Sequence, residues 1–246
     1  MTNKIQNNEL HRLLYPVFQS VLDLEAIEIT PPLCKSFKQV YIPLLLWIAK
    51  QQTQTPLIVG INGAQGSGKT TLVKILKKML ETAYGKSVVI LSLDNFYKTR
   101  ASRLQMAKRI HPLFKTRGVP GTHDVELGIG IIEQLKTGMA ERVVLPVFDK
   151  LIDDRMSHDR WLLINGRVDI VLFEGWCVGA IAESDSDILL PINDLERQED
   201  RKAVWRNYVN CQLSQEYRRW FALLDCLVML QIPDDSKIFL WRRLQE

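Results

Sequence analysis

GAQGSGKT, residues 63–70, fits the pattern G-x-x-x-x-G-K-[ST] at every fixed position. A short apolar run, residues 57–61, precedes it, as expected of a strand that is buried on both faces. After it, apolar residues recur at helical spacing from Leu72 to Ala83, with charged residues between them. A strand that enters such a loop and a helix that leaves it are the context in which this pattern binds phosphate. The stretch therefore predicts a phosphate-binding loop in an α/β fold.

Each part of the loop has a chemical reason. Glycines lack Cβ, so the backbone can curl until several N–H groups point at phosphate oxygens, and the helix N-terminus adds partial positive charge. Lys69 is expected to reach the β- and γ-phosphates, and the Thr70 hydroxyl is expected to bind Mg²⁺. The predicted nucleotide-binding residues are Gly63, Ala64, Gln65, Gly66, Ser67, Gly68, Lys69, Thr70 and Thr71. Mg²⁺ is thus an expected cofactor, together with a nucleotide.

Composition excludes several classes of protein. Charged residues make up 24% and hydrophobic residues 46% of the 246 residues, which is ordinary for a globular domain. The formal charge of +4 is spread out, without a basic block interleaved with aromatics, so no nucleic-acid partner is expected. The most apolar early run, residues 41–48, is too short to span a membrane. The N-terminus lacks a signal core and the four cysteines form no C-x-x-C pair, which predicts a cytoplasmic protein with reduced thiols.

Three further apolar runs alternate with helical patterns. Residues 87–93 and 168–173 read as buried strands, and residues 227–232 read as a fourth strand. This order favours a doubly wound parallel sheet in a three-layer P-loop fold. Helices are expected from Leu195 to Phe221 and again from residue 236 onward.

Domain boundaries follow from the same patterns. One domain is predicted over residues 1–246, with a core at 56–246 and a helical lid at about 184–221. Residues 1–55 hold two helical patterns separated by Pro31-Pro32, and this extension is expected to pack on the sheet.

Two acidic residues follow predicted strands directly. Asp94 comes after the second strand and Glu174 after the third. Ligands gather outside the carboxyl ends of strands in open α/β sheets, so both lie where they can act. Glu174 is expected to be a second oxygen group near Mg²⁺. Asp94 either caps the next turn or accepts the proton of an acceptor hydroxyl, as a kinase requires.

Other candidates for binding an acceptor lie between these strands. The basic segment 98–121 is expected to be mostly a solvated face, from which Arg117 stands out because its loop is bounded by Gly and Pro. Asp124, beside His123, is expected to cap a helix. A charged loop that includes Asp153 reads either as a solvated turn or as a mobile contact to a small anion. The remaining acceptor candidates are Tyr97, His123, Asp149, Lys150 and Arg155.

The chain resembles P-loop kinases of the phosphoribulokinase and uridine kinase type and, within them, the D-glycerate 3-kinase family. The similar segments are GINGAQGSGKTTL, LSLDNFYKT, RGVPGTHDVEL, LPVFDKLIDDR, VLFEGWCVG, NDLERQEDRKAVWRNYVN and WRRLQE, which run from about residue 57 to the end. Family members continue past WRRLQE, so a truncated or naturally short form is expected. Plant-type and fungal members carry a Gly-rich stretch that ends in Gly-Asp-Arg where this chain has Leu-Ile-Asp-Asp-Arg.

The resemblance implies ATP-dependent phosphorylation of a small hydroxy compound, for this family D-glycerate to 3-phosphoglycerate. It implies that Lys69, Asp94 and Glu174 are catalytic, with Asp94 as the base and with Thr70 and Glu174 at the metal. A regulatory ATPase without a metabolite acceptor, or a kinase for a nucleoside or pantothenate, is the alternative. The sequence leaves the oligomeric state open.

Overall fold

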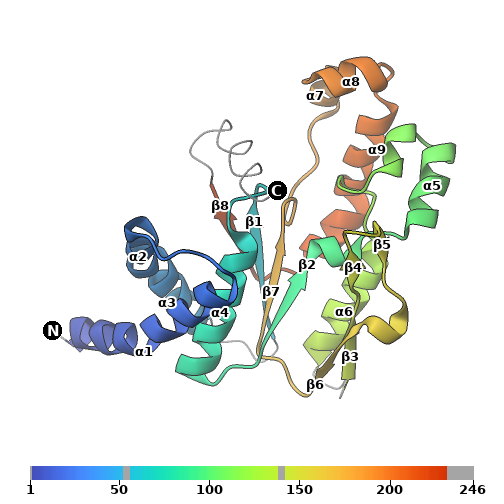
Figure 1. The fold of residues 1–246 in the computed structure, drawn as a ribbon. Coiled ribbons are helices and arrows are strands. Elements are labelled where there is room, and N and C mark those ends of the chain that lie inside the picture. Colours follow the sequence, from blue (N-terminus) through green and yellow to red (C-terminus); the bar gives the residue numbers. More distant parts are fainter. Residues whose placement is uncertain (1, 52–55, 138–141, 232–246) are drawn as a thin grey trace. The chain divides into compact units, whose positions relative to one another are not determined.

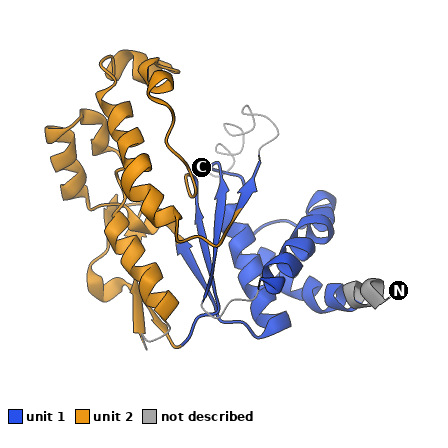
Figure 2. Ribbon diagram, turned by 180° about the vertical axis from the view of Figure 1, so that it is seen from behind, with its two compact units in different colours: residues 1–91, 167–176, 228–246 blue, residues 92–166, 177–227 orange. Residues whose placement is uncertain are grey.

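The computed structural model describes residues 2–51, 56–137 and 142–231. The chain forms two compact units, which are coloured separately in Figure 2. Unit 1 contains residues 1–91, 167–176 and 228–246, and unit 2 contains residues 92–166 and 177–227. The chain therefore passes between the two units four times.

Among the described residues, the central sheet has four strands in the order β2-β7-β1-β8. Their bounds are Leu57–Gly63 for β1, Val88–Ser92 for β2, Ile170–Gly175 for β7 and Cys226–Leu230 for β8. β1 and β7 are parallel, with Leu57 opposite Ile170 and Asn62 opposite Gly175, and the four arrows point the same way in Figure 1. The structure confirms the predicted doubly wound α/β class, a parallel sheet with flanking helices.

Helix α4, Lys69–Tyr84, carries the amphipathic pattern that follows the phosphate loop. Its apolar face is buried and contacts β1 and β7. Gly85 ends the helix in a left-handed conformation, with φ of 59°, and its N–H donates to the carbonyls of the last turn. Glycine suits this position because a Cβ would strain the backbone there.

The N-terminal extension forms α1 (Thr2–Leu24), α2 (Pro31–Ser36), a π-helical turn (Phe37–Tyr41) and α3 (Ile42–Lys50). Pro31 opens α2, where its missing N–H is not needed. Both α1 and α3 contact α4, and Lys74 of α4 pairs with Glu25 at 2.6 Å. The extension was expected to pack on the sheet, but it packs mainly on α4, because that helix already lies against β1 and β7.

Unit 2 contains short helices and two antiparallel strand pairs. The pairs are β3 (Arg142–Leu145) with β6 (Leu162–Asn165), and β4 (Phe148–Asp149) with β5 (Asp154–Arg155). The helices are α5 (Arg100–Arg109), α6 (Val125–Thr137), α7 (Asp185–Leu189), α8 (Asp194–Glu199), α9 (Val204–Gln212) and α10 (Arg218–Phe221). The shorter helical turns are η2 (Leu93–Phe96), η3 (Pro112–Lys115), η4 (His158–Arg160) and the π-helical η5 (Leu213–Tyr217). Phe114, Tyr217 and Trp220 are fully buried and form part of the core of this unit.

The helical stretch expected from about Leu195 to Phe221 is interrupted, because α8 ends at Glu199 and α9 begins at Val204. Between them Ala203 adopts a left-handed conformation with φ of 56°. The carboxylate of Asp200 accepts hydrogen bonds from the N–H groups of residues 205 and 206 and so holds the start of α9. The predicted helix from residue 236 lies outside the described residues.

The guanidinium of Arg206 joins α7, α8 and α9. It bonds to the carbonyl of Ile188 at 3.0 Å and lies 3.4 Å from Glu196 and 3.8 Å from Asp200, all of them buried. Its charge is therefore internal to the predicted lid segment rather than directed at solvent.

Within residues 2–51, 56–137 and 142–231, no helix is long and apolar enough to cross a membrane. All four cysteines carry free thiols. The same described ranges hold no group of three or more His, Cys, Asp or Glu residues placed to bind a metal ion together.

Candidate active site

The phosphate loop of unit 1 joins β1 to α4. Gly66 and Gly68 have φ of 80° and 85°, a left-handed conformation that strains any residue with a Cβ. A Cβ on Gly63 would lie 2.6 Å from Ser67 Oγ and 3.0 Å from Leu230 Cβ, so this position also requires glycine. The backbone thus curls into the N-terminus of a 16-residue helix, whose first N–H groups have no partner within the helix.

Three predicted side chains gather at this loop. The buried Lys69 folds back so that its Nζ donates to the carbonyl of Ala64 at 2.9 Å. Thr70 Oγ1 lies 3.5 Å from Oε1 of Glu174, which is 6% exposed and stands at the end of β7 opposite Ile61. The sheet thus brings together residues that lie more than a hundred positions apart in the sequence.

The loop residues fit a nucleotide with Mg²⁺. Ser67 Oγ is buried and has no hydrogen-bond partner among the described residues, so it can bond to a ligand oxygen. The amides at the start of α4 and the ammonium of Lys69 suit phosphate. Thr70 and Glu174 offer the hard oxygen ligands that Mg²⁺ prefers. Of the other loop residues predicted to bind nucleotide, Ala64 and Thr71 are half-buried and Gln65 is exposed.

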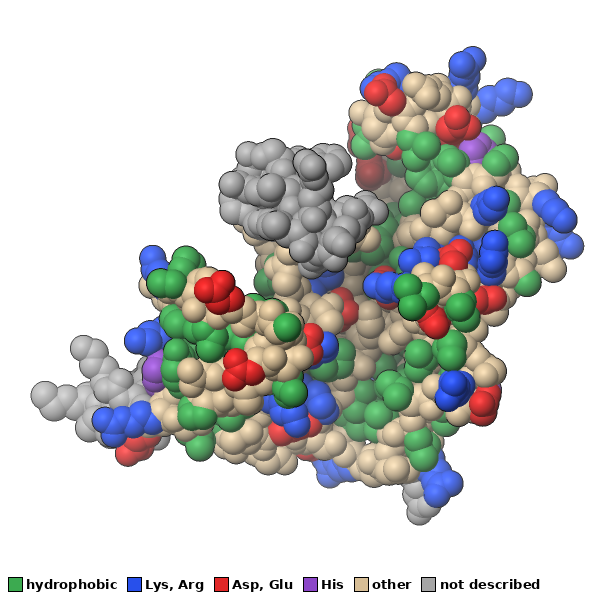
Figure 3. Space-filling model, in the orientation of Figure 1, with side chains coloured by type: hydrophobic (Ala, Val, Ile, Leu, Met, Phe, Trp, Pro, Cys, Tyr) green, Lys and Arg blue, Asp and Glu red, His purple; other side chains and the backbone are tan. Residues whose placement is uncertain are grey.

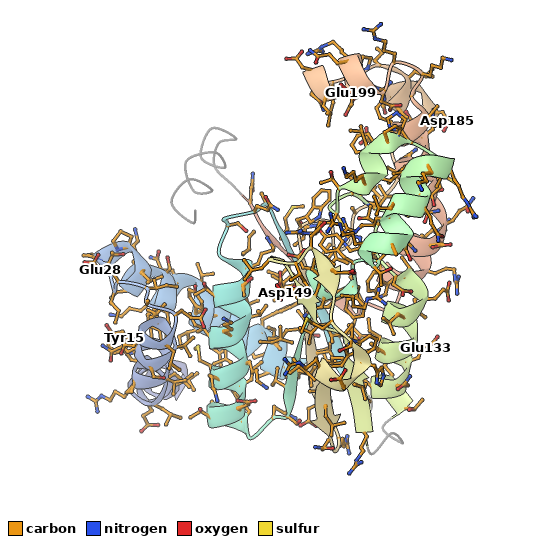
Figure 4. The ribbon with its side chains drawn as sticks, turned by 45° about the vertical axis from the view of Figure 1, so that its right-hand side comes forward. Tyr15, Glu28, Glu133, Asp149, Asp185 and Glu199 are labelled. Carbon is orange, nitrogen blue, oxygen red and sulfur yellow. The ribbon has the colours of Figure 1, made fainter. Side chains whose placement is uncertain are left out.

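In unit 2, Asp94 lies in the η2 turn, two residues after the end of β2. Its Oδ2 forms an ion pair with Nζ of Lys150 at 2.7 Å, and the two side chains are 32% and 62% exposed. Lys150 begins the turn between β4 and β5, beside Asp149, which is labelled in Figure 4. The structure therefore brings together two predicted residues that are 56 positions apart.

Tyr97 and His123 are paired along the backbone and through their rings. An isolated β-bridge joins them, the N–H of Lys98 donates to the carbonyl of Thr122 at 2.8 Å, and the N–H of Asp124 donates to the carbonyl of Phe96 at 2.7 Å. The rings stack with centroids 4.3 Å apart. Burial, together with the nearby carboxylate of Asp94, raises the pKa of Tyr97.

His123 is fully buried, and burial lowers its pKa to about 3 although the charge of Asp94 acts in the opposite direction. The ring is therefore neutral near pH 7. Its Nδ1 lies 2.6 Å from the hydroxyl of Tyr217, which also accepts the N–H of Gly121 at 2.9 Å. The direction of the hydrogen bond between this hydroxyl and Nδ1 depends on which ring nitrogen of the neutral His123 carries the proton. Sequence reasoning missed Tyr217, since one tyrosine in a helical pattern carries no signal of this contact.

The predicted arginines have internal partners. Arg155 donates to the carbonyls of Phe96 and Tyr97 and pairs with Asp124 at 3.0 Å. Asp124 also accepts the N–H of Leu127, so it caps α6 as predicted.

Arg117 pairs with Asp153 and lies over the ring of Phe148, 5.4 Å from its centroid.

Arg103 was expected on a solvated face, but it is fully buried. Its guanidinium pairs with Asp153 at 3.0 Å and donates to backbone carbonyls, including that of Lys115 at 2.9 Å. The Asp149 carboxylate accepts the N–H of Leu151 at 2.8 Å and stabilises the β4–β5 turn.

Charges of both signs lie on the surface of each unit. On the face drawn in Figure 3, Lys and Arg side chains (blue) are interspersed with Asp and Glu side chains (red) among the described residues. On this face the basic and acidic side chains are thus mixed rather than gathered into one patch of a single sign.

Fold and loop define the class of protein. The first strand of the parallel sheet leads through a Gly-rich turn into a helix that begins with Lys and Thr. This is the arrangement of P-loop nucleotide-binding proteins. The family described as the KAP family P-loop domain matches residues 38–138.

Similar proteins are kinases. The uncharacterized kinase mug58 of Schizosaccharomyces pombe is 35% identical over 204 residues, which cover 78% of this chain and 70% of that protein. The chloroplastic D-glycerate 3-kinase of Arabidopsis thaliana is 28% identical over 243 residues, covering 90% of this chain and 50% of that protein. The solved structure of D-glycerate 3-kinase from Cryptococcus neoformans var. grubii has a TM-score of 0.67 and 28% identity, over 84% of this chain and 75% of that one. The chain belongs to the family of ATP-dependent P-loop kinases that includes these proteins.

Proposed function

We propose that this kinase transfers the γ-phosphoryl group of ATP to a hydroxyl of D-glycerate and forms 3-phosphoglycerate. The observation that carries the proposal is the Asp94–Lys150 pair at 2.7 Å. It places a carboxylate that can take a hydroxyl proton beside a cation that can bind the carboxylate of a hydroxy acid. The D-glycerate 3-kinases among the relatives support the same acceptor.

In this proposal the phosphate loop holds ATP through its amides and Lys69. Thr70 and Glu174 hold Mg²⁺, which supplies charge neutralisation at the phosphates. Asp94 orients the acceptor hydroxyl and accepts its proton during in-line transfer, without a covalent intermediate. Tyr97 and the neutral His123 shape the acceptor side, and His123 is a poor base for the hydroxyl proton because burial lowers its pKa to about 3.

A nucleoside or pantothenate is the alternative acceptor. Kinases named for pantothenate and uridine are similar to about half of this chain, 52% and 48%. A regulatory ATPase is the alternative from another class, and it requires no acceptor.

ADP release from ATP and Mg²⁺ tests the proposal, first without acceptor and then with D-glycerate, a nucleoside or pantothenate. Turnover that depends on D-glycerate alone is expected. Asp94→Asn should lower kcat by about 100- to 10,000-fold with ATP affinity retained, because it removes the proton acceptor. Lys69→Met should instead weaken ATP binding, measured by calorimetry. Hydrolysis that ignores every acceptor, or an Asp94→Asn variant with normal turnover, would contradict the proposal.

A further inference from the structure

The cations on the acceptor side differ in how firmly they are held. The Arg155 side chain is 12% exposed and bonds to two backbone carbonyls as well as to Asp124. Arg117 pairs with Asp153 and covers the ring of Phe148. A ligand that recruited either arginine would have to break contacts that hold unit 2 together. Both are therefore poorly suited to bind and release an acceptor.

Lys150 is held differently. Its side chain is 62% exposed, and its ion-pair partner is Asp94, the proposed base, at 2.7 Å. Ion pairs this exposed contribute little to stability, so exchange of one carboxylate for another is easy. The lysine stem has four flexible carbons, and the residue stands at the first position of the β4–β5 turn. Lys150 is thus the acceptor-side cation best placed to change its partner.

The ion pair has a consequence for catalysis. While the ammonium group of Lys150 holds Oδ2, that oxygen is engaged and is not available in the same direction to an incoming hydroxyl. An uncharged acceptor offers Lys150 nothing to replace Asp94. An acceptor that carries a carboxylate offers an equivalent anion.

We propose that Lys150 selects carboxylate-bearing acceptors by leaving Asp94 for the carboxylate of the acceptor, and that this exchange frees Asp94 to act as the base. The inference rests on the proposed function and adds a mechanism by which the acceptor activates its own phosphorylation. With water or a neutral alcohol the exchange would not occur, so turnover with them should be low.

The chemical step is a direct transfer of the γ-phosphoryl group to the acceptor oxygen. The O–H bond of the acceptor breaks and its proton passes to Asp94, while the oxygen forms a bond to the γ-phosphorus of ATP. The bond between that phosphorus and the bridging oxygen of ADP breaks, and its electron pair leaves with ADP. Lys150 exchanges one ionic partner for another and forms no covalent bond.

The test compares D-glycerate with its uncharged amide, D-glyceramide, as acceptors for the full chain. The variants are Lys150→Met and, as a matched control, Lys115→Met. Lys115 is an exposed lysine of the same unit with no ion-pair partner among the described residues. Initial rates of ADP release give kcat and KM for each combination of protein and acceptor. Detection of the phosphorylated product confirms that the acceptor was the substrate.

In the wild type, kcat for the amide should be at least about tenfold below kcat for D-glycerate. Lys150→Met should raise KM for D-glycerate by about tenfold or more and should raise kcat for the amide, because Asp94 is then free without a carboxylate. Adding Asp94→Asn to Lys150→Met should abolish the gain with the amide. Lys115→Met should behave as the wild type with both acceptors.

Two results would overturn the inference while leaving the proposed function intact. If Lys150→Met weakens D-glycerate binding but leaves kcat for the amide at or below the wild-type value, Lys150 is a simple anchor. Equal losses with both acceptors would assign it a structural role. A wild-type enzyme that binds ATP but phosphorylates only a nucleoside or pantothenate would overturn the proposed function, and this inference with it.

Discussion

Replacing Tyr217 by Phe tests whether the contact to His123 organises unit 2. The change removes one oxygen and keeps the ring. That oxygen lies 2.9 Å from the N–H of Gly121 and 2.6 Å from Nδ1 of His123, and both contacts are buried. Two buried polar groups therefore lose their partner at once.

The magnitude follows from burial. A buried polar group without a partner costs about 1–3 kcal/mol, so the two together give about 3 kcal/mol after partial relaxation. For a chain of this size that corresponds to a fall in Tm of about 6–12 °C. The indole of Trp220, with its ring centroid 6.0 Å from that of Tyr217, gives a fluorescence signal for urea unfolding.

Tyr208→Phe is the matched control, because the Tyr208 hydroxyl makes no hydrogen bond to any described residue and the ring is only half-buried. It should change the free energy of unfolding by less than about 0.5 kcal/mol. A loss below about 1 kcal/mol in Tyr217→Phe would refute the reasoning, since the two buried groups would then have found other partners.

Two further changes test the packing of unit 2. Asp153→Asn should lower stability by about 1–2 kcal/mol at pH 7, a value reduced for the partial exposure of the carboxylate. Burial opposes the charged form of Asp153, but hydrogen bonds from Arg117 and Arg103 hold its pKa below the usual range. That stabilisation is complete above the ordinary aspartate pKa and disappears as the pH falls through the lowered pKa of Asp153. The difference in free energy of unfolding between the wild type and Asp153→Asn should therefore vanish below about pH 4 in urea titrations. A stability difference between the two proteins that grows as the pH falls would contradict this reasoning. Gly128→Ala should destabilise by about 1–3 kcal/mol, because the new methyl group would overlap the buried indole of Trp220, whereas Gly130→Ala on the same helix meets no atom within 4 Å and should be neutral or stabilising in thermal melts.

The sheet and the phosphate loop could be predicted because their signals are local. Apolar runs of strand length and a fixed spacing of Gly, Lys and Thr depend on residues close together in the chain. The positions of Asp94 and Glu174 followed from the same runs, since Asp94 lies two residues after β2 and Glu174 lies at the end of β7. The roles of these residues in catalysis stay predictions.

The burial and the ion-pair partners of the charged residues could not be predicted, because they depend on contacts between segments far apart in the sequence. Arg103 looked like one cation of a solvated segment, yet it is buried against Asp153, fifty positions further along the chain. The break before α9 was hidden for a related reason. The break at residues 200–203 contains no Gly or Pro, the residues that usually mark the end of a helix in a sequence. The cap formed by Asp200 and the left-handed conformation of Ala203 are visible only in the structure.

The strand order determines when the nucleotide-binding end of the molecule can form during synthesis. The neighbours of β1 in the sheet are β7 and β8, whereas β2, the next strand in the sequence, lies beyond β7. Residue 57 therefore has to wait for residue 170 before it can pair. At translation rates of about 5–20 residues per second, this wait lasts roughly 5–25 seconds, during which a largely apolar strand has both edges open. The stretch that is most recognisable in the sequence thus emerges early from the ribosome but is among the last to acquire its structure, and it needs protection from aggregation in the meantime.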